Sequence, residues 1–259
     1  MKRKIIIITA IFSLMLGTSC IHINKNVNSD IIQYSGYDTV IPVDVDDYTR
    51  IEANKLFAVV MSDTVKSPYL VIDTALMNHF TINCNNKTLK VKLLANASVS
   101  SSFEDTDELD SFNLTGARYP TLYLPFNSKL MHIQTNGAAK FECDVPITMP
   151  ELEIQAGGAS NINIAVDVEK LEGDVSGASG VYVKGKSDLL IARCHGAGNI
   201  GGEIICKEGD ICCSGASVAE GIECTTKMKA ETSGASEITY SGNCSSEEHA
   251  SGVSSINHI

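Results

Sequence analysis

The stretch DVSGASGVYV, residues 174–183, returns as CCSGASVAEG at 212–221 and as ETSGASEITY at 231–240. Outward from these copies, a glycine followed by alanine, or once by valine, occurs seven times in the C-terminal half of the chain. These glycines are Gly137, Gly158, Gly177, Gly196, Gly215, Gly234 and Gly252, separated by 21, 19, 19, 19, 19 and 18 residues. So regular a step predicts a solenoid, and it is too short for the roughly 40-residue blades of a propeller.

The residues on either side of each glycine alternate between apolar and polar. Two and four residues before the glycine the side chains are mostly small or apolar, as at Ala156 and Ile154, whereas three before it they are mostly polar, as at Gln155. This period of two is typical of a strand with one buried face. We therefore predict an all-β fold, a single-chain right-handed parallel β-helix (β-solenoid) with coils of about 19 residues.

The seven glycines are predicted to be structural turn residues, because a sharp corner needs a backbone φ that other residues rarely adopt. The residue that follows each glycine is expected to be buried, because a small side chain suits an inside corner with little room. On that expectation, a leucine in place of Ala197 overpacks its corner and destabilises the fold by about 1–3 kcal/mol.

The N-terminus predicts export. A basic start (MKRK) precedes an apolar run at residues 5–16, and small residues stand directly before Cys20. This arrangement resembles the lipobox of bacterial lipoproteins, so residues 1–19 are predicted to be a signal peptide and Cys20 the lipidation site. Residues 20–36 are then the lipidated Cys and a flexible tether. The alternative is an ordinary secretory signal followed by an unmodified cysteine.

The remaining residues, 37–259, are predicted to form one domain, with N-terminal strands at 37–135 and regular Gly-Ala-Ser coils at 136–259. The whole chain has a formal net charge of −11, which repels phosphate backbones, so nucleic acid is excluded as a partner. Eight cysteines besides Cys20 lack the paired spacing of zinc sites, and we expect no metal and no cofactor. They are predicted to be buried thiols. Disulfides between neighbouring coils are the alternative, since Cys194 and Cys213 share one position in adjacent repeats.

The N-terminal half carries a recognisable order of motifs. Residues 47–51 (DYTRI) are followed by Tyr69-Leu70-Val71, by KTLKV at 87–91 and by LYLP at 122–125, before the Ser-Gly-Ala-Ser turns begin. Over about residues 40–259 this order resembles the head GIN domain family of auto-transporter adhesins, common in lipoproteins of the Bacteroidetes. The resemblance implies a β-helix without an established enzymatic activity. The N-terminal strands are expected to continue the solenoid or to cap it.

The predicted function is that of a cell-envelope lipoprotein with a non-catalytic binding domain. Its partners are the membrane, through the N-terminal lipid, and a carbohydrate or envelope protein ligand; clustered surface aromatics would favour a sugar. No residue is assigned a catalytic role. The alternatives are a polysaccharide-active β-helix enzyme, whose site needs converging carboxylates, and a purely structural envelope protein. Because no acidic residue follows Cys20 before Asp30, the periplasmic side of the outer membrane is favoured over the cell surface.

Overall fold

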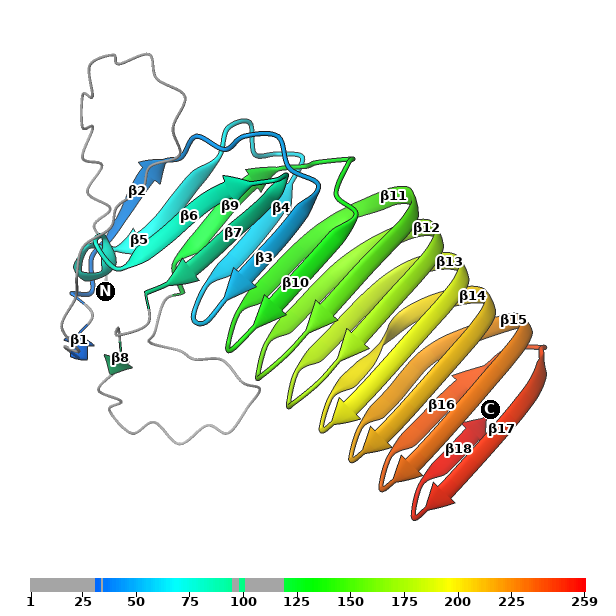
Figure 1. The fold of residues 1–259 in the computed structure, drawn as a ribbon. Helices are drawn as coiled ribbons and strands as arrows, with labels where there is room; N and C mark the ends of the chain where they lie inside the picture. Colours follow the sequence, from blue (N-terminus) through cyan, green and yellow to red (C-terminus); the bar gives the residue numbers. More distant parts are fainter. Residues whose placement is uncertain (1–30, 34, 95–97, 101–118) are drawn as a thin grey trace, which may run out of the picture.

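The computed structural model describes residues 31–33, 35–94, 98–100 and 119–259, and there the chain forms a β-solenoid of about 7 turns with coils of about 19 residues. Five long strands each make almost a whole coil: β11 (Lys140–Ala156), β12 (Asn161–Val175), β13 (Gly180–Gly196), β14 (Asn199–Gly215) and β15 (Val218–Gly234). Each pairs in parallel with the next, so the coils stack in sequence order (Figure 1). The prediction of a β-solenoid is confirmed.

Shorter strands complete the two ends of the solenoid. At the C-terminal end, β17 (Ser245–Gly252) pairs with β15, and β18 (Ser255–His258) pairs with β16 (Glu237–Ser241). At the other end, β10 (His132–Asn136) and the start of β11 lie on β3 (Arg50–Asn54) and β4 (Ala58–Ser62), which lie in turn on β7 (Thr88–Leu93) and β9 (Thr121–Pro125). Coils at this end are therefore assembled from segments far apart in the sequence.

Antiparallel strands close the N-terminal end of the stack. The strands β2 (Asp38–Pro42) and β5 (Tyr69–Asp73) pair with each other, β5 also pairs with β9, and β6 (Phe80–Asn85) pairs with β7. A short 3-10 helix, η1 (Thr74–Leu76), follows β5, and β1 (Ile31–Gln33) pairs with β8 (Ser98–Ser100) apart from the main sheet. The N-terminal half thus both continues and caps the solenoid.

The core is a set of rows in which equivalent residues of successive coils lie side by side. The side chains of one such row are each at most 2% exposed: Phe141, Ile162, Val181, Ile200, Ala219 and Ile238. Another row contains Leu190, Gly209 and Met228, and there the thioether of Met228 fills the space that a side chain at Gly209 would occupy. Each coil therefore buries its inner face mainly against its neighbours, as expected for a solenoid.

The seven corner glycines all lie in the left-handed region, with φ between 75° and 89°. The backbones at the corners also approach closely. The N–H of Ala178 donates to the carbonyl of Gly158 at 2.7 Å, and the equivalent bond recurs from coil to coil. A Cβ added to Gly177 would lie only 2.5 Å from that same carbonyl oxygen. Backbone angle and close approach therefore both require glycine here.

The prediction that the residues after these glycines are buried is wrong. Ala178, Ala197, Ala216 and Ala235 are exposed, and Val253 at the same position is 85% exposed. The period of two continues through the corner, so the next residue points inward instead. The buried hydroxyl of Ser217 donates to the carbonyls of Cys194 and Ser214, and Ser236 makes the equivalent pair of bonds. Because Ala197 is exposed, a leucine side chain at this position extends into solvent and does not overpack the corner.

The first coil turns its corner without glycine. Lys55 takes φ 63° directly above Gly137, whose added Cβ would lie 2.9 Å from the Lys55 Cα. Ile51, Ala53 and Val59 stand at the buried positions that surround the corner in the later repeats. This coil belongs to the same architecture although its sequence lacks the Gly-Ala signature.

The departures from a 19-residue step are β-bulges on one face. The strand β11 has extra residues between Cys143 and Ile147, where β12 passes from Ile164 to Val166. The strand β15 has one extra residue between Ala219 and Ile222 relative to β16. These irregularities account for the first step of 21 residues and the last of 18. A further bulge between Gly201 and Ile204 stands at the same level of β14.

Several predicted features lie outside the described residues: the signal peptide, Cys20 and most of the tether. The last residues of the predicted tether contact the domain, because the buried carboxylate of Asp73 accepts hydrogen bonds from the N–H groups of Ser35 and Gly36. The cysteines of the coils are free thiols: Cys143, Cys194, Cys206, Cys212, Cys213, Cys224 and Cys244.

Candidate binding groove on the solenoid face

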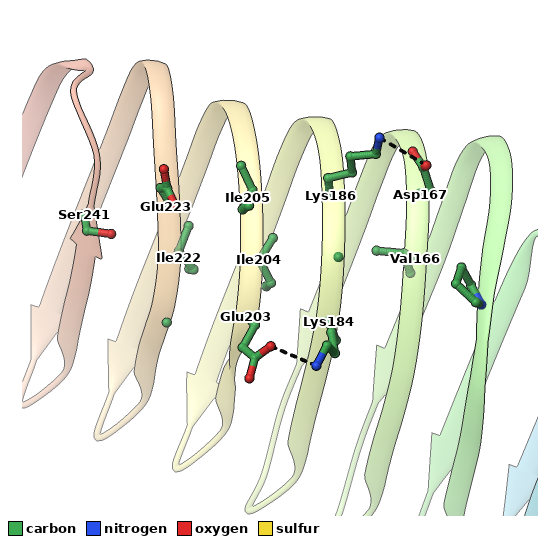
Figure 2. A pocket seen from close by; sticks show the side chains of 13 residues that line it. Val166, Asp167, Lys184, Lys186, Glu203, Ile204, Ile205, Ile222, Glu223 and Ser241 are labelled. Atoms are coloured by element: carbon green, nitrogen blue, oxygen red, sulfur yellow. Dashed lines mark ion pairs between the residues drawn. The ribbon is translucent and has the colours of Figure 1, made fainter.

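A groove of about 590 Å³ crosses neighbouring coils on the outer face of the solenoid (Figure 2). Its floor is one register row across β12 to β15: Val166, Gly185, Ile204 and Ile222. The three side chains of this row are at most 2% exposed. These side chains point into the core, so the backbone of the row forms the floor of the groove. The exposed apolar side chains that line the groove are those of Pro146 and Ile205.

Both rims of the groove are charged. One rim is the row Asp167, Lys186, Ile205, Glu223 and Ser241, and the other carries Lys184 beside Glu203. Lys186 Nζ lies 3.3 Å from Asp167 Oδ2, and Lys184 Nζ lies 3.1 Å from Glu203 Oε2, as the dashed lines of Figure 2 show. The hydrogen bond that Lys184 donates to Glu203 raises the pKa of the ammonium. The rims thus present both signs of charge beside the exposed side chain of Ile205.

Glycines let neighbouring coils approach closely along the groove. Gly185 and Gly202 have φ of 126° and 136°, and an added Cβ would lie 2.0 Å from the carbonyl oxygen of Val166 and 2.1 Å from that of Val183 respectively. Gly202 lies in the bulge between Gly201 and Ile204, whereas the register through Gly185 is continuous. After Gly202 the strand alternates as usual, so Ile204 points inward and Ile205 is 49% exposed on the rim.

Sequence reasoning missed this groove. The glycines beside it, Gly185, Gly202, Gly221 and Gly242, stand eight, six, six and eight residues after their corner glycines, so the four do not share one position of the repeat. Four isolated glycines within strand patterns were nevertheless a signal, since such residues often mark bulges. None of the lining residues is aromatic.

The outward row three residues before the corners holds Asp174, Arg193, Cys212, Glu231 and His249 side by side. Its charges are paired with neighbours on the same face. Arg193 donates two hydrogen bonds to the carboxylate of Asp210, at 3.1 and 3.0 Å, and Glu231 lies 2.9 Å from Lys229 Nζ. Since Arg193 and Cys212 stand between Asp174 and Glu231, these carboxylates do not converge on one point. Over the described ranges, no three His, Cys, Asp or Glu side chains are grouped to hold a metal.

One buried histidine forms a pair that the sequence did not indicate. His132 is 2% exposed, and its Nδ1 lies 2.8 Å from Glu153 Oε2 on the next coil. Burial favours the neutral carboxyl, but the hydrogen bonds from His132 and Gln155, together with the nearby Arg50, outweigh burial, so the pKa of Glu153 lies below its ordinary value. His195, in contrast, lies on an exposed corner with its Nδ1 2.7 Å from the Ser214 hydroxyl. Neither histidine lines the groove.

Comparison with known proteins places most of the chain in one family. The family model described as "Putative auto-transporter adhesin, head GIN domain" matches residues 47–244. No curated protein matches. No helix of the described residues is long and apolar enough to span a membrane.

Solved structures from Bacteroides and Parabacteroides share the fold. A "putative adhesin" of Bacteroides fragilis NCTC 9343 is similar with a TM-score of 0.71 at 18% identity, over 88% of this chain and 100% of that one. A "putative adhesin" of Parabacteroides distasonis ATCC 8503 has a TM-score of 0.67 at 20% identity, over 89% and 100%. A "putative lipid binding protein" of the same organism has a TM-score of 0.60 at 18% identity, over 89% and 100%. At these identities the likeness shows the fold alone.

Proposed function

The chain belongs to the head GIN domain family of auto-transporter adhesins, and from that premise we propose that it is a non-catalytic binding protein of the cell envelope. In this proposal, residues 1–19 are removed on export, Cys20 carries the lipid, and residues 37–259 form the binding domain. The protein is held at the outer membrane with its solenoid on the periplasmic side. The basic and apolar N-terminus and the absence of acidic residues between Cys20 and Asp30 support this placement.

The groove of Figure 2 is proposed to bind an extended segment of an envelope protein. The observation that carries this proposal is a groove with exposed apolar side chains, Pro146 and Ile205, between two rims of mixed charge. Apolar side chains of a partner can pack on Pro146 and Ile205, while its backbone and charged groups meet the Lys and Glu side chains of the rims. A groove without aromatic rings is a poor platform for sugar faces.

The charges near the groove support a binding role rather than a catalytic one. Lys184 and Lys186 are each held by a carboxylate of a neighbouring coil, and the lining residues include no histidine or cysteine. A hydrolase or lyase site needs a carboxylate acid–base pair facing one substrate bond. In the groove the acidic groups are spread along the axis instead.

Site-specific photo-crosslinking in living cells tests the groove. A photoreactive phenylalanine analogue at Ile205 should give a discrete protein adduct, because this exposed position overlooks the floor. The matched control places the same analogue at Lys227, an exposed position on the next coil outside the groove. Reversing the rim with Lys184→Glu and Lys186→Glu should remove the adduct at position 205. The same adducts at 205 and 227, or none at 205, would contradict the proposal.

A further inference from the structure

A second hollow, of about 410 Å³, lies near the end of the solenoid that the antiparallel strands close. It is on the outer face, over β4, β9 and the start of β11, the strands that follow the corners of their coils. Its base is β4, which carries the small side chains Ala58 and Val60. The neighbouring strands on either side carry larger ones: Tyr119 precedes β9 and Tyr123 lies within it, whereas Lys140 and Glu142 lie on β11. We name this hollow the tyrosine slot; Thr121 of β9, Val71, Ile72 and Asp73 of β5, and Asp38 of β2 complete its lining. With two strand spacings between β9 and β11, its walls stand about 9.6 Å apart at the backbone.

One wall of the tyrosine slot is an aromatic face held in place from behind. Tyr69 of β5 stacks on Tyr123, with ring centroids 4.7 Å apart and planes 11° from parallel. Since β5 and β4 flank β9 on opposite sides, Tyr69 covers one face of the Tyr123 ring, and the other face is turned toward Val60. The stack fixes the ring upright without closing the slot. Burial, with the nearby Tyr69 and Glu142, raises the pKa of Tyr123, so its hydroxyl stays protonated at neutral pH.

The opposite wall supplies hydrogen-bonding groups. The exposed Glu142 faces Tyr123 across Val60, because both residues are register partners of that valine. Lys140 reaches over the slot, with Nζ 4.9 Å from the centre of the Tyr119 ring. On the next two coils Asn163 and then the exposed Tyr182 continue the row beyond Glu142. An aromatic face thus stands opposite a carboxylate, with an amide and a second ring further along the same line.

We propose that the tyrosine slot binds a pyranose unit of a neutral glycan. A pyranose has an apolar face of C–H groups that packs on an aromatic ring, and a rim of hydroxyls that bond to carboxylate, amide and ammonium groups. The net charge of −11 disfavours anionic sugars such as uronates. The row from Tyr123 through Glu142 and Asn163 to Tyr182 gives a chain of such units a path along the solenoid. This site is separate from the groove of Figure 2 and does not depend on it.

Ligand-observed NMR with defined sugars tests the proposal. The full chain, in a detergent without a sugar headgroup, is mixed with the trimers of N-acetylglucosamine, α-glucose or mannose, and saturation transfer to the sugar is measured. At least one trimer should receive saturation. Tyr123→Ala should raise its Kd about tenfold, whereas Tyr123→Phe, which keeps the ring, should leave it within about twofold. Glu142→Gln on the exposed wall should weaken binding without affecting folding.

Ile205→Ser, in the groove of Figure 2, serves as the control and should leave sugar binding unchanged. Weaker sugar binding in Tyr123→Ala and Glu142→Gln, with binding retained in Tyr123→Phe and in the groove variant, supports the slot, whatever the crosslinking at position 205 shows. No saturation transfer to any of the three trimers overturns the proposal. So does undiminished binding in both Tyr123→Ala and Glu142→Gln, or equally strong binding of a trigalacturonate.

Discussion

Gly215 stands at a corner where the backbone angle and a close contact both disfavour a Cβ atom. Its φ is 89°, and an added Cβ would lie 2.6 Å from the carbonyl oxygen of Gly196 in the coil before. The next residue, Ala216, has neither constraint, because its side chain is exposed. Adjacent residues of one motif therefore differ sharply in what they tolerate, and the reason is direction: Gly215 faces the neighbouring backbone, whereas Ala216 faces solvent.

Substitutions at this corner should separate the two residues. Gly215→Ala should lower the free energy of unfolding by about 1–3 kcal/mol, from backbone strain and the contact with Gly196. Ala216→Leu should change it by no more than about 0.5 kcal/mol, as at an ordinary surface position. Urea unfolding followed by circular dichroism measures both. If the leucine variant proved the less stable of the two, the described orientation of the corner would be wrong.

At the scale of elements, the parallel register places like residues of successive strands beside one another. Cys206 of β14 is the partner of Cys224 of β15, and Cys194 of β13 is the partner of Cys213 of β14. All four are at most 1% exposed. Burial raises the pKa of such a thiol, as at Cys143, where it reaches about 11. Burial also raises the pKa of Cys206, whereas the hydrogen bond between Cys194 and Cys213 raises the pKa of Cys194 and lowers that of Cys213. All four thiols pack as small side chains away from solvent.

Alkylation with iodoacetamide at pH 8 should follow this order. Cys212, half-buried on the outer face, should react before the buried thiols, because solvent and reagent reach it although burial raises its pKa as well. Cys143 and Cys206 should react only as fast as the protein unfolds, since a raised pKa leaves almost no thiolate and burial blocks access. Mass spectrometry of peptides over a time course gives the rates, with urea-unfolded protein as the control. Rapid labelling of Cys206 in the folded protein would contradict this packing.

The whole molecule has unlike ends. Antiparallel strands β2, β5 and β6 close one end (Figure 1), whereas the other is closed by the last coil itself. There Ser246 and Glu248 occupy positions that are mostly apolar in earlier coils, and both are exposed. The hydroxyl of the buried Tyr240 donates to the Glu248 carboxylate. Polar residues at inward positions shield the end of the core and make further stacking of coils unfavourable.

The proposed anchor acts on the whole molecule and is tested with it. Cys20→Ala should leave the protein unprocessed or release it from the membrane fraction, because the acyl chains that supply membrane affinity are absent. Immunoblots of fractionated cells measure the distribution. Equal membrane partition of the variant and the wild type would refute lipidation.

The proposed periplasmic orientation is tested by protease treatment of intact cells. The solenoid should survive in unbroken cells and be degraded once the outer membrane is permeabilised. Complete loss of the domain from unbroken cells would show surface display instead.

Much of the fold was predictable because it depends on short-range constraints. A period of two, a left-handed residue at each corner and a step of about 19 residues are properties of one coil, and each leaves its mark within that coil's own sequence. The burial of the residue after each glycine was predicted wrongly because the corner was treated apart from the alternation. Ser217 and its equivalents show that the alternation runs through it.

The sequence by itself determined the strands, the corner glycines and the stacking of like on like, because neighbouring coils repeat one local pattern. Only the tertiary structure decided where surfaces form. The groove lies along glycines whose position shifts from coil to coil, and Ile204 and Ile222 meet through register and not through spacing. The tyrosine slot joins Val60, Tyr123 and Glu142, which come from three strands far apart in the sequence. Which strands lie side by side at the capped end is settled by packing of the shared core, and no local pattern records that choice.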